Sequence, residues 1–178
     1  ITIPVTALAI PNAGPDKIFC LGQNAVQLQA MGGIQYSWSP TTGLSNPNIA
    51  NPMAFPATTT NYVVSVGVAG CSRTRKDTVR VTARPKPALD VTNDTTICIV
   101  DPLQLQALGN GQVSWWPATS LSSTTSPTPI ASPDSFIVYH VRLTASIGCF
   151  SEDSLSVQVK RKTVIDAGAD TAICKPEG

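Results

Sequence analysis

Charged residues, histidine and long apolar runs are all scarce in this sequence of 178 residues. Asp, Glu, Lys and Arg make up 13% of the chain, against roughly 25% in an average globular domain. The formal net charge is +1, so nothing in the charge favours binding to nucleic acid or to an anionic membrane surface. No apolar run approaches the roughly 20 residues of a membrane-spanning helix. We therefore expect neither a nucleic-acid partner nor membrane insertion.

The side chains that carry most enzyme chemistry are also few. His140 is the only histidine, and it stands between two apolar residues of an alternating segment, so it is expected to face solvent. A nucleophile would have no second histidine as its base, and the chain has no glycine-rich phosphate loop and no recurrent close pair of carboxylates. These absences predict a protein that is not an enzyme and that holds no cofactor and no metal.

The main features of the sequence occur twice at a nearly constant spacing. Cys20 and Cys71 are 51 positions apart, as are Cys98 and Cys149, and the two pairs are offset by 78. Other landmarks keep nearly the same offset: Trp38 matches Trp115, Pro40 matches Pro117, Leu44 matches Leu121, and Tyr62 matches Tyr139. Many coincidences at one interval indicate a tandem repeat.

The period sets the expected domain boundaries. Residues 13–87 form one repeat and 88–163 a second, while 1–12 resemble the end of a preceding repeat and 164–178 open a third. We therefore expect the chain to be part of a longer array. Proline in the linker "ARPKPALD" predicts a stiff connection.

Each repeat has the pattern of a small β-sandwich. Apolar residues alternate with polar ones, as at Tyr62, Val64 and Val66 and again at Leu155 and Val157, and no segment keeps a helical period. About seven short strands in each repeat predict two packed sheets. Trp38 and Trp115 end inward-facing strands, so we expect them to plug the core, the alternative being an exposed sugar-stacking platform. Trp116 points to the opposite face and is the candidate contact for a partner.

The cysteines are expected to form disulfide bonds that stabilise these small cores. We expect Cys20–Cys71 and Cys98–Cys149 disulfides, each closing a loop of about 50 residues and contributing on the order of 4 kcal/mol. A zinc site would need more Cys or His ligands, and free thiols are the other alternative. Cys174 is left unpaired within these residues, because by the repeat its expected partner lies further along the array. Disulfides imply an oxidising compartment and hence export from the cell.

Acidic residues recur near the ends of the repeats. Asp16, Asp94 and Asp170 each stand four positions before a cysteine, and Asp77 and Asp153 open another matched segment. They could hold calcium at a junction of repeats, but aspartate also caps turns and strand ends with its side chain, and we favour that interpretation.

The motifs "AGPDKIFCLGQNAVQLQAMGG", "YSWSPTTGLSNPNIANPMAFPATTTNYVVSV" and "DTVRV" together resemble the PKD-like and Ig-like repeats of very large Bacteroidota surface proteins. Those proteins leave the cell through the type IX secretion system and include gliding-motility adhesins of the SprB kind. The second repeat departs from the pattern, since "WWPATSLSSTTSP" lacks the glycine and the Asn-Pro pairs.

The resemblance implies β-sandwich repeats. Together with the strand pattern and the cysteine spacing, it predicts an all-β fold of tandem Ig-like/PKD-like β-sandwich modules, each with one intramodule disulfide. It implies an extracellular stalk or adhesive repeat at the cell surface, the alternative being a carbohydrate-binding or accessory module of a secreted enzyme. Expected partners are neighbouring repeats, surface polysaccharide and other cell-surface proteins. Bacteroidota attach O-glycans at Asp-Ser/Thr motifs, so candidate glycosylation sites are Thr78, Thr95, Ser154 and Thr171, although such motifs also simply begin strands in a Thr-rich chain.

Overall fold

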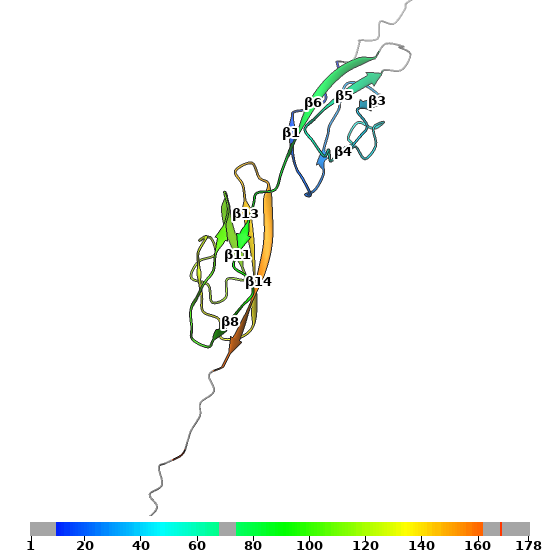
Figure 1. Cartoon of the computed structure of the whole chain (residues 1–178). Helices are drawn as coiled ribbons and strands as arrows, with labels where there is room; N and C mark the ends of the chain where they lie inside the picture. Colours follow the sequence, from blue (N-terminus) through cyan, green and yellow to red (C-terminus); the bar gives the residue numbers. More distant parts are fainter. Residues whose placement is uncertain (1–9, 68–73, 162–167, 169–178) are drawn as a thin grey trace, which may run out of the picture. The chain divides into compact units, whose positions relative to one another are not determined.

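The computed structural model describes residues 10–67, 74–161 and 168 (Figure 1). Within these ranges every regular element is a β-strand. The chain divides into two compact units. Unit 1 contains Ile1–Ala88 and Thr144–Ser151, and unit 2 contains Leu89–Leu143 and Glu152–Gly178. The predicted all-β, Ig-like sandwich architecture is confirmed.

Unit 1 has one four-stranded sheet and one two-stranded sheet. The larger sheet has the strand order β1 (Lys17–Cys20), β6 (Arg75–Arg84), β5 (Thr60–Gly67), β3 (Gln35–Ser39). The smaller sheet pairs β2 (Val26–Gln27) with β4 (Met53–Ala54). Strands β3, β5 and β6 are antiparallel neighbours, whereas β1 runs parallel to β6.

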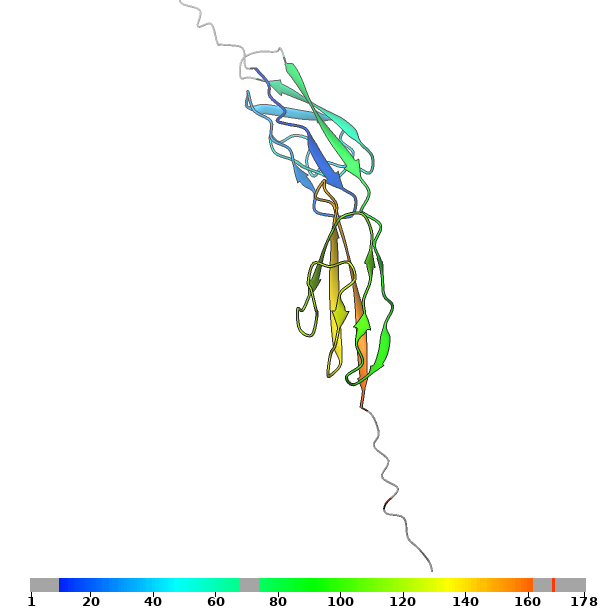
Figure 2. The ribbon, with the colours of Figure 1, turned by 90° about the vertical axis from the view of Figure 1, so that its left-hand side faces the viewer.

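Unit 2 repeats this topology. Its four-stranded sheet has the order β11 (Gln112–Trp116), β13 (Ile137–Thr144), β14 (Phe150–Lys160), β8 (Thr95–Cys98). Figure 2 shows the long strand β14 (orange) beside β13 (yellow). Two short pairs complete the unit, β9 (Leu103–Gln104) with β12 (Ile130–Ala131) and β7 (Asp90–Val91) with β10 (Ala107–Leu108). Strand β8 is again parallel to β14.

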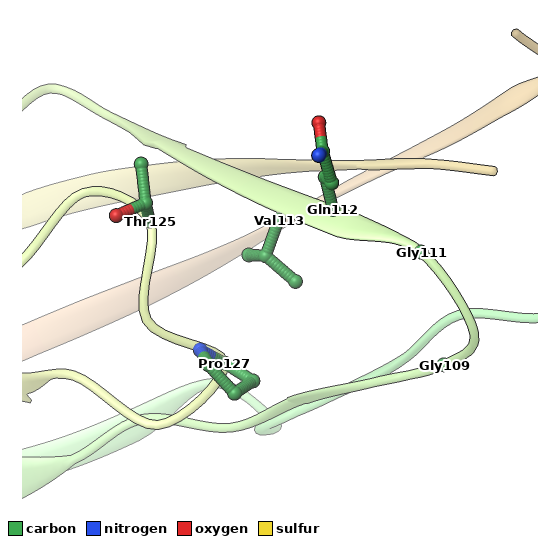
Figure 3. Close-up of a pocket in the computed structure, with 6 residues that line it drawn as sticks. All are labelled: Gly109, Gly111, Gln112, Val113, Thr125 and Pro127. Carbon is green, nitrogen blue, oxygen red and sulfur yellow. The ribbon is translucent and has the colours of Figure 1, made fainter. Parts of the chain in front are cut away.

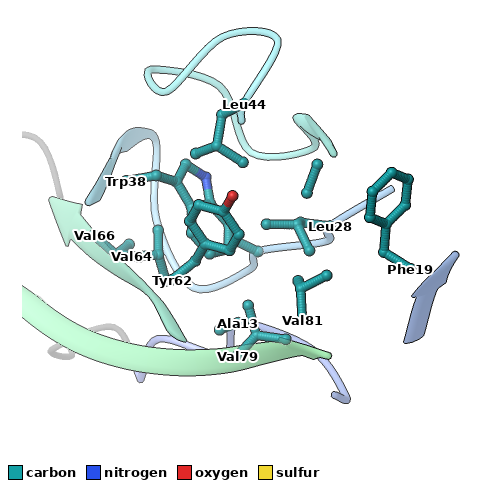
Figure 4. Close-up of a cluster of buried hydrophobic side chains, with 12 residues drawn as sticks. Ala13, Phe19, Leu28, Trp38, Leu44, Tyr62, Val64, Val66, Val79 and Val81 are labelled. Carbon is teal, nitrogen blue, oxygen red and sulfur yellow. The ribbon is translucent and has the colours of Figure 1, made fainter. Parts of the chain in front are cut away.

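The core of unit 1 lies between its two sheets. Alternate residues of β5 and β6 are buried, as the period of two requires, and Leu28 and Ala54 join them from the side of the smaller sheet. Figure 4 shows Trp38 and Tyr62 packed against each other at the centre, and both are at most 1% exposed. Burial raises the pKa of the Tyr62 hydroxyl, and that of Tyr139 in unit 2, by desolvation.

The two central rings also hold the loop that follows β3. The indole Nε1–H of Trp38 donates a hydrogen bond to the carbonyl oxygen of Ile49 at 2.9 Å, and the Tyr62 hydroxyl donates to that of Thr42 at 2.8 Å. A buried ring with a satisfied polar end can therefore pin an irregular loop to the core. The polar stretch after Trp38 is thus a structural loop that is held against the core by hydrogen bonds.

Unit 2 has the same pair of anchors. Trp115 donates to the carbonyl oxygen of Ser126 at 2.9 Å, and Tyr139 donates to that of Thr119 at 3.0 Å. Trp115 is 2% exposed. The prediction that Trp38 and Trp115 plug the cores is confirmed, and the alternative of an exposed sugar-stacking platform is wrong for both.

The loop keeps its shape although the second repeat lacks the glycine. Gly43 has a φ of 74°, and Ser120 at the matching position has a φ of 60°. The carbonyl oxygen of Gly43 accepts a hydrogen bond from the Phe55 amide, and that of Ser120 accepts one from the Ser132 amide. The tertiary hydrogen bonds thus impose on a serine a left-handed backbone that glycine adopts more readily.

Adjacent tryptophans on opposite faces of β11 provide a matched test of this core. Replacing Trp115 with Phe removes a buried hydrogen bond and leaves a cavity, so we expect the free energy of unfolding to fall by about 2–4 kcal/mol. Replacing exposed Trp116 with Phe should change it by less than about 0.5 kcal/mol. Urea-induced unfolding followed by circular dichroism measures both, and equal losses would contradict the assignment of Trp115 to the core.

Candidate functional site: an inter-repeat disulfide and an exposed aromatic pair

The parallel first strand of each unit decides where its cysteine lies. In unit 2, Cys98 is aligned with Lys160 at the end of β14, whereas Cys149 directly precedes Phe150 at the start of that strand. The 11 residues of β14 span about 33 Å. Because the Cα atoms of a disulfide lie within about 7 Å, these two cysteines cannot pair. The predicted Cys98–Cys149 disulfide is therefore wrong.

The bond that forms instead is Cys20–Cys149, with a Cα–Cα distance of 5.5 Å and a sequence separation of 129. The predicted Cys20–Cys71 pairing is wrong because the sulfur of Cys20 is bonded to that of Cys149. The disulfide thus joins cysteines of different sequence repeats. Both lie in unit 1, since Thr144–Ser151 belongs to that unit.

Hydrogen bonds support the disulfide within unit 1. The side-chain amide of Gln23 donates to the carbonyl oxygen of Phe150 at 2.7 Å, and the Ser151 hydroxyl donates to that of Pro87 at 2.6 Å. Cys149 is fully buried. The segment around Cys149 is therefore held by one covalent bond and by polar contacts on its C-terminal side.

The remaining cysteines have different outcomes. Cys98 is a free, exposed thiol. Cys71 and Cys174 lie outside the described residues, so Cys174 as an unpaired thiol stays a prediction.

The exposed aromatic pair lies on the outer face of the larger sheet of unit 2. The rings of Trp116 and His140 stack with centroids 5.5 Å apart and an interplanar angle of 18°. Trp116 is 39% exposed, and His140 also faces solvent as predicted. At the matching position of unit 1 stand Ser39 and Val63, which are aligned across β3 and β5. The pair is thus particular to unit 2.

A charged pair lies two residues along β13 on the same face. Arg142 donates from Nε to Oε1 of Glu152 at 2.7 Å, and both side chains are nearly half exposed. An exposed ion pair of this kind contributes little to stability. The outer face of unit 2 therefore presents an exposed aromatic pair beside an exposed ion pair.

The hollow in Figure 3 has a volume of about 560 Å³ and lies beside the turn before β11. The turn contributes Gly109 and Gly111, the opposite loop contributes Thr125 and Pro127, and Val113 points between them. None of its lining residues titrates, so the hollow offers shape but no acid, base or nucleophile.

The recurrent aspartates accept backbone hydrogen bonds. Asp16 accepts from the Arg80 amide at 2.9 Å, Asp94 from the Ser156 amide at 2.7 Å, and Asp77 from the Ala13 amide at 2.8 Å. These contacts support the interpretation as caps that join strand ends. Among the described residues, no cluster of His, Cys, Asp or Glu could hold a metal ion. Asp170 lies outside them.

The candidate glycosylation sites differ in accessibility. Thr78 and Ser154 are exposed, whereas Thr95 is half-buried and its hydroxyl donates to the carbonyl oxygen of Asn93 at 2.8 Å. Thr171 lies outside the described residues. Glycosylation at these positions stays a prediction.

Comparison with known proteins yields similar folds but no family. No protein-family model and no curated protein matches the chain. Superposable structures include immunoglobulin domains 1–4 of Sidekick-1 (13% identity, 87% of this chain and 50% of that chain, TM-score 0.38). Insect hemolin (15%, 85% and 47%, 0.42) and extracellular domains 3–5 of Drosophila OTK (13%, 82% and 59%, 0.42) are others.

The chain spans about half the length of the first of these structures. The fold class follows from the chain's own sheets and buried cores. The protein is thus a tandem of Ig-like β-sandwich units. In the described ranges, no helix is long and apolar enough to cross a membrane.

Serine substitutions separate the bonded cysteines from the free one. Cys20→Ser and Cys149→Ser each open the same 129-residue loop, so each should lower the free energy of unfolding by about 2–5 kcal/mol. Cys98→Ser is the matched control and should leave stability unchanged. Urea denaturation without reductant measures the three variants, and a loss in Cys98→Ser equal to that in Cys20→Ser would contradict the pairing.

Proposed function

We propose that this chain is a non-enzymatic structural and adhesive segment of a long extracellular protein, serving as a stalk or display module at the cell surface. The observation that carries the proposal is the Cys20–Cys149 disulfide between different sequence repeats. Structural disulfides persist in oxidising environments, which supports export.

The covalent connectivity suits a chain that bears load. When the two ends of the chain are pulled, tension passes from Cys20 through the disulfide to Cys149 and bypasses the residues between them. This loop holds all of β2 to β13, including the central rings Trp38, Tyr62, Trp115 and Tyr139. Both cores therefore keep most of their strands off the covalent path of the force.

The finer form of the proposal is a repeat of a gliding-motility adhesin of the SprB kind, exported from Bacteroidota by type IX secretion. Its support is the motif resemblance of the first repeat, above all the stretch from Trp38 to Pro47. In this form the chain is a glycoprotein, and its partners are neighbouring repeats together with surface polysaccharide or other surface proteins, with Trp116 as the contact.

The alternative of a carbohydrate-binding module draws on the same tryptophan. Because His140 stacks against Trp116 in unit 2, at most one face of the indole is available to a sugar ring. The matching pair in unit 1 is Ser39 and Val63, which has no aromatic ring. A continuous row of rings along the array is therefore not formed by these positions, and the stalk function is favoured.

Single-molecule stretching tests the load-bearing role. With the disulfide intact, the loop between Cys20 and Cys149 should contribute nothing to the unfolded length. Reduction should add roughly 450 Å, from 129 residues at about 3.5 Å each. The Cys20→Ser variant is the control and should show the longer extension without reductant. Equal extensions of the oxidised and reduced chain would contradict the bypass.

Antibody labelling of intact cells tests the location. Antibodies raised against this chain should label unpermeabilised cells of the source organism as strongly as permeabilised ones, because the repeats are displayed outside. An antibody against a cytoplasmic protein is the control for membrane integrity. Labelling that requires permeabilisation would overturn the proposed surface role.

A further inference from the structure

Cys98 has the backbone setting of the bonded Cys20. Each cysteine ends the strand that runs parallel to the last strand of its sheet, aligned with Lys160 and Arg84 respectively. The next amide donates to the carbonyl oxygen of that aligned residue at 2.8 Å in both units, from Ile99 in one and Leu21 in the other. The backbone of Cys98 is thus placed in unit 2 as the backbone of Cys20 is placed in unit 1.

The turn after the cysteine is also the same in both units. The Gln23 amide donates to the carbonyl oxygen of Cys20 at 3.0 Å, and the Asp101 amide donates to that of Cys98 at 3.1 Å. The third residue of the turn is Gly22 with a φ of 75° in unit 1 and Val100 with a φ of 74° in unit 2. A β-branched residue rarely adopts this conformation, so the matching turn is retained despite an unsuitable side chain.

The disulfide of Cys20 shows what this position bonds to. Its partner, Cys149, belongs to the next sequence repeat and directly precedes that repeat's last strand, β14. Cys71 occupies the matching sequence position in the first repeat, so each repeat carries one cysteine of each kind. The disulfide thus joins the cysteine in the first strand of one repeat to the cysteine that precedes the last strand of the following repeat.

We infer that Cys98 is a disulfide-forming site for the cysteine that precedes the last strand of the following repeat, so that disulfides run in series along the array. The inference rests on the proposed repeat array. It assigns a partner to the exposed thiol of Cys98, and by the same rule Cys174 pairs with the repeat after that one.

The bond forms by thiol–disulfide exchange with an external disulfide, such as that of a dithiol oxidase. The Cys98 thiolate attacks one sulfur of the external disulfide, whose S–S bond breaks and releases one thiolate that takes up the proton lost by Cys98. The partner cysteine then attacks the mixed disulfide and releases the second thiol in the same way. Two protein thiols are oxidised and one external disulfide is reduced to two thiols.

One hydrogen bond near the Cys20–Cys149 disulfide has no counterpart at the inferred disulfide of Cys98. Gln23 donates its side-chain amide to the carbonyl oxygen of Phe150, whereas Asp101, at the matching position, has no side-chain donor when ionised. The link from Cys98 therefore lacks this hydrogen bond and depends more on the covalent bond itself.

Disulfide mapping of the parent protein tests the inference. The protein is isolated with N-ethylmaleimide, digested without reduction and analysed by mass spectrometry. We expect the Cys98 peptide to be linked to a peptide of the following repeat, beside the Cys20–Cys149 link. A Cys98 peptide that carries maleimide, or that is linked to Cys71, would overturn the inference.

Two serine variants of the parent sharpen the result. Cys98→Ser should add one maleimide, on the cysteine before the last strand of the following repeat, and Cys20→Ser, the matched control, should add one on Cys149. No added maleimide in Cys98→Ser would overturn the inference. The two proposals fail in different ways. If antibodies label the cell surface but Cys98 carries maleimide, only the inference of serial disulfides is refuted. If Cys98 is disulfide-linked but the protein is not at the surface, only the proposed function is refuted.

Discussion

The parallel pairing of the first strand with the last strand is the constraint on which the rest of this structure depends. It places Cys20 beside Arg84 and Cys98 beside Lys160, at the ends of β6 and β14. A strand of ten or eleven residues then separates each first-strand cysteine from the start of the last strand. In the second repeat, a Cys98–Cys149 disulfide would have to span that length, and the bond that forms is Cys20–Cys149.

The cores are closed by rings whose polar ends hold the loops. Each unit buries one tryptophan and one tyrosine at its centre. Each of these side chains donates a hydrogen bond to a carbonyl oxygen of the loop that follows β3 in unit 1 or β11 in unit 2. The loop is rich in Ser, Thr, Pro and Asn and has little apolar surface of its own. Its fixed conformation, including the left-handed Ser120, therefore comes from the core beneath it.

The disulfide connectivity and the outer faces of the two units both support the proposed stalk or display role. The disulfide between repeats keeps the intervening chain out of the covalent path of tension, which supports the proposed stalk role. The outer face of unit 2 differs from that of unit 1, with stacked Trp116 and His140 where unit 1 has Ser39 and Val63. A shared framework with different outer faces is consistent with the proposed display role, because the sheets can stay constant while surface contacts vary.

Much of the fold could be predicted from local pattern. The alternation of apolar residues identified the buried faces of β5 and β13, and the recurrence of Trp38 as Trp115 identified the plugs of the cores, because periodicity and repetition are properties of neighbouring residues. The exposure of Trp116 and His140 followed from the same alternation.

The sequence by itself determined that this chain is a tandem of small β-sandwiches with a candidate aromatic contact on one face. Only the tertiary structure decided which cysteines meet. Equal spacings of 51 residues suggested pairs within each repeat, but a spacing along the chain carries no information on the direction of a strand in its sheet. The parallel pairing of β8 with β14 keeps Cys98 away from Cys149 and leaves it exposed, whereas the tertiary structure brings Cys20 beside Cys149, which is 129 residues away.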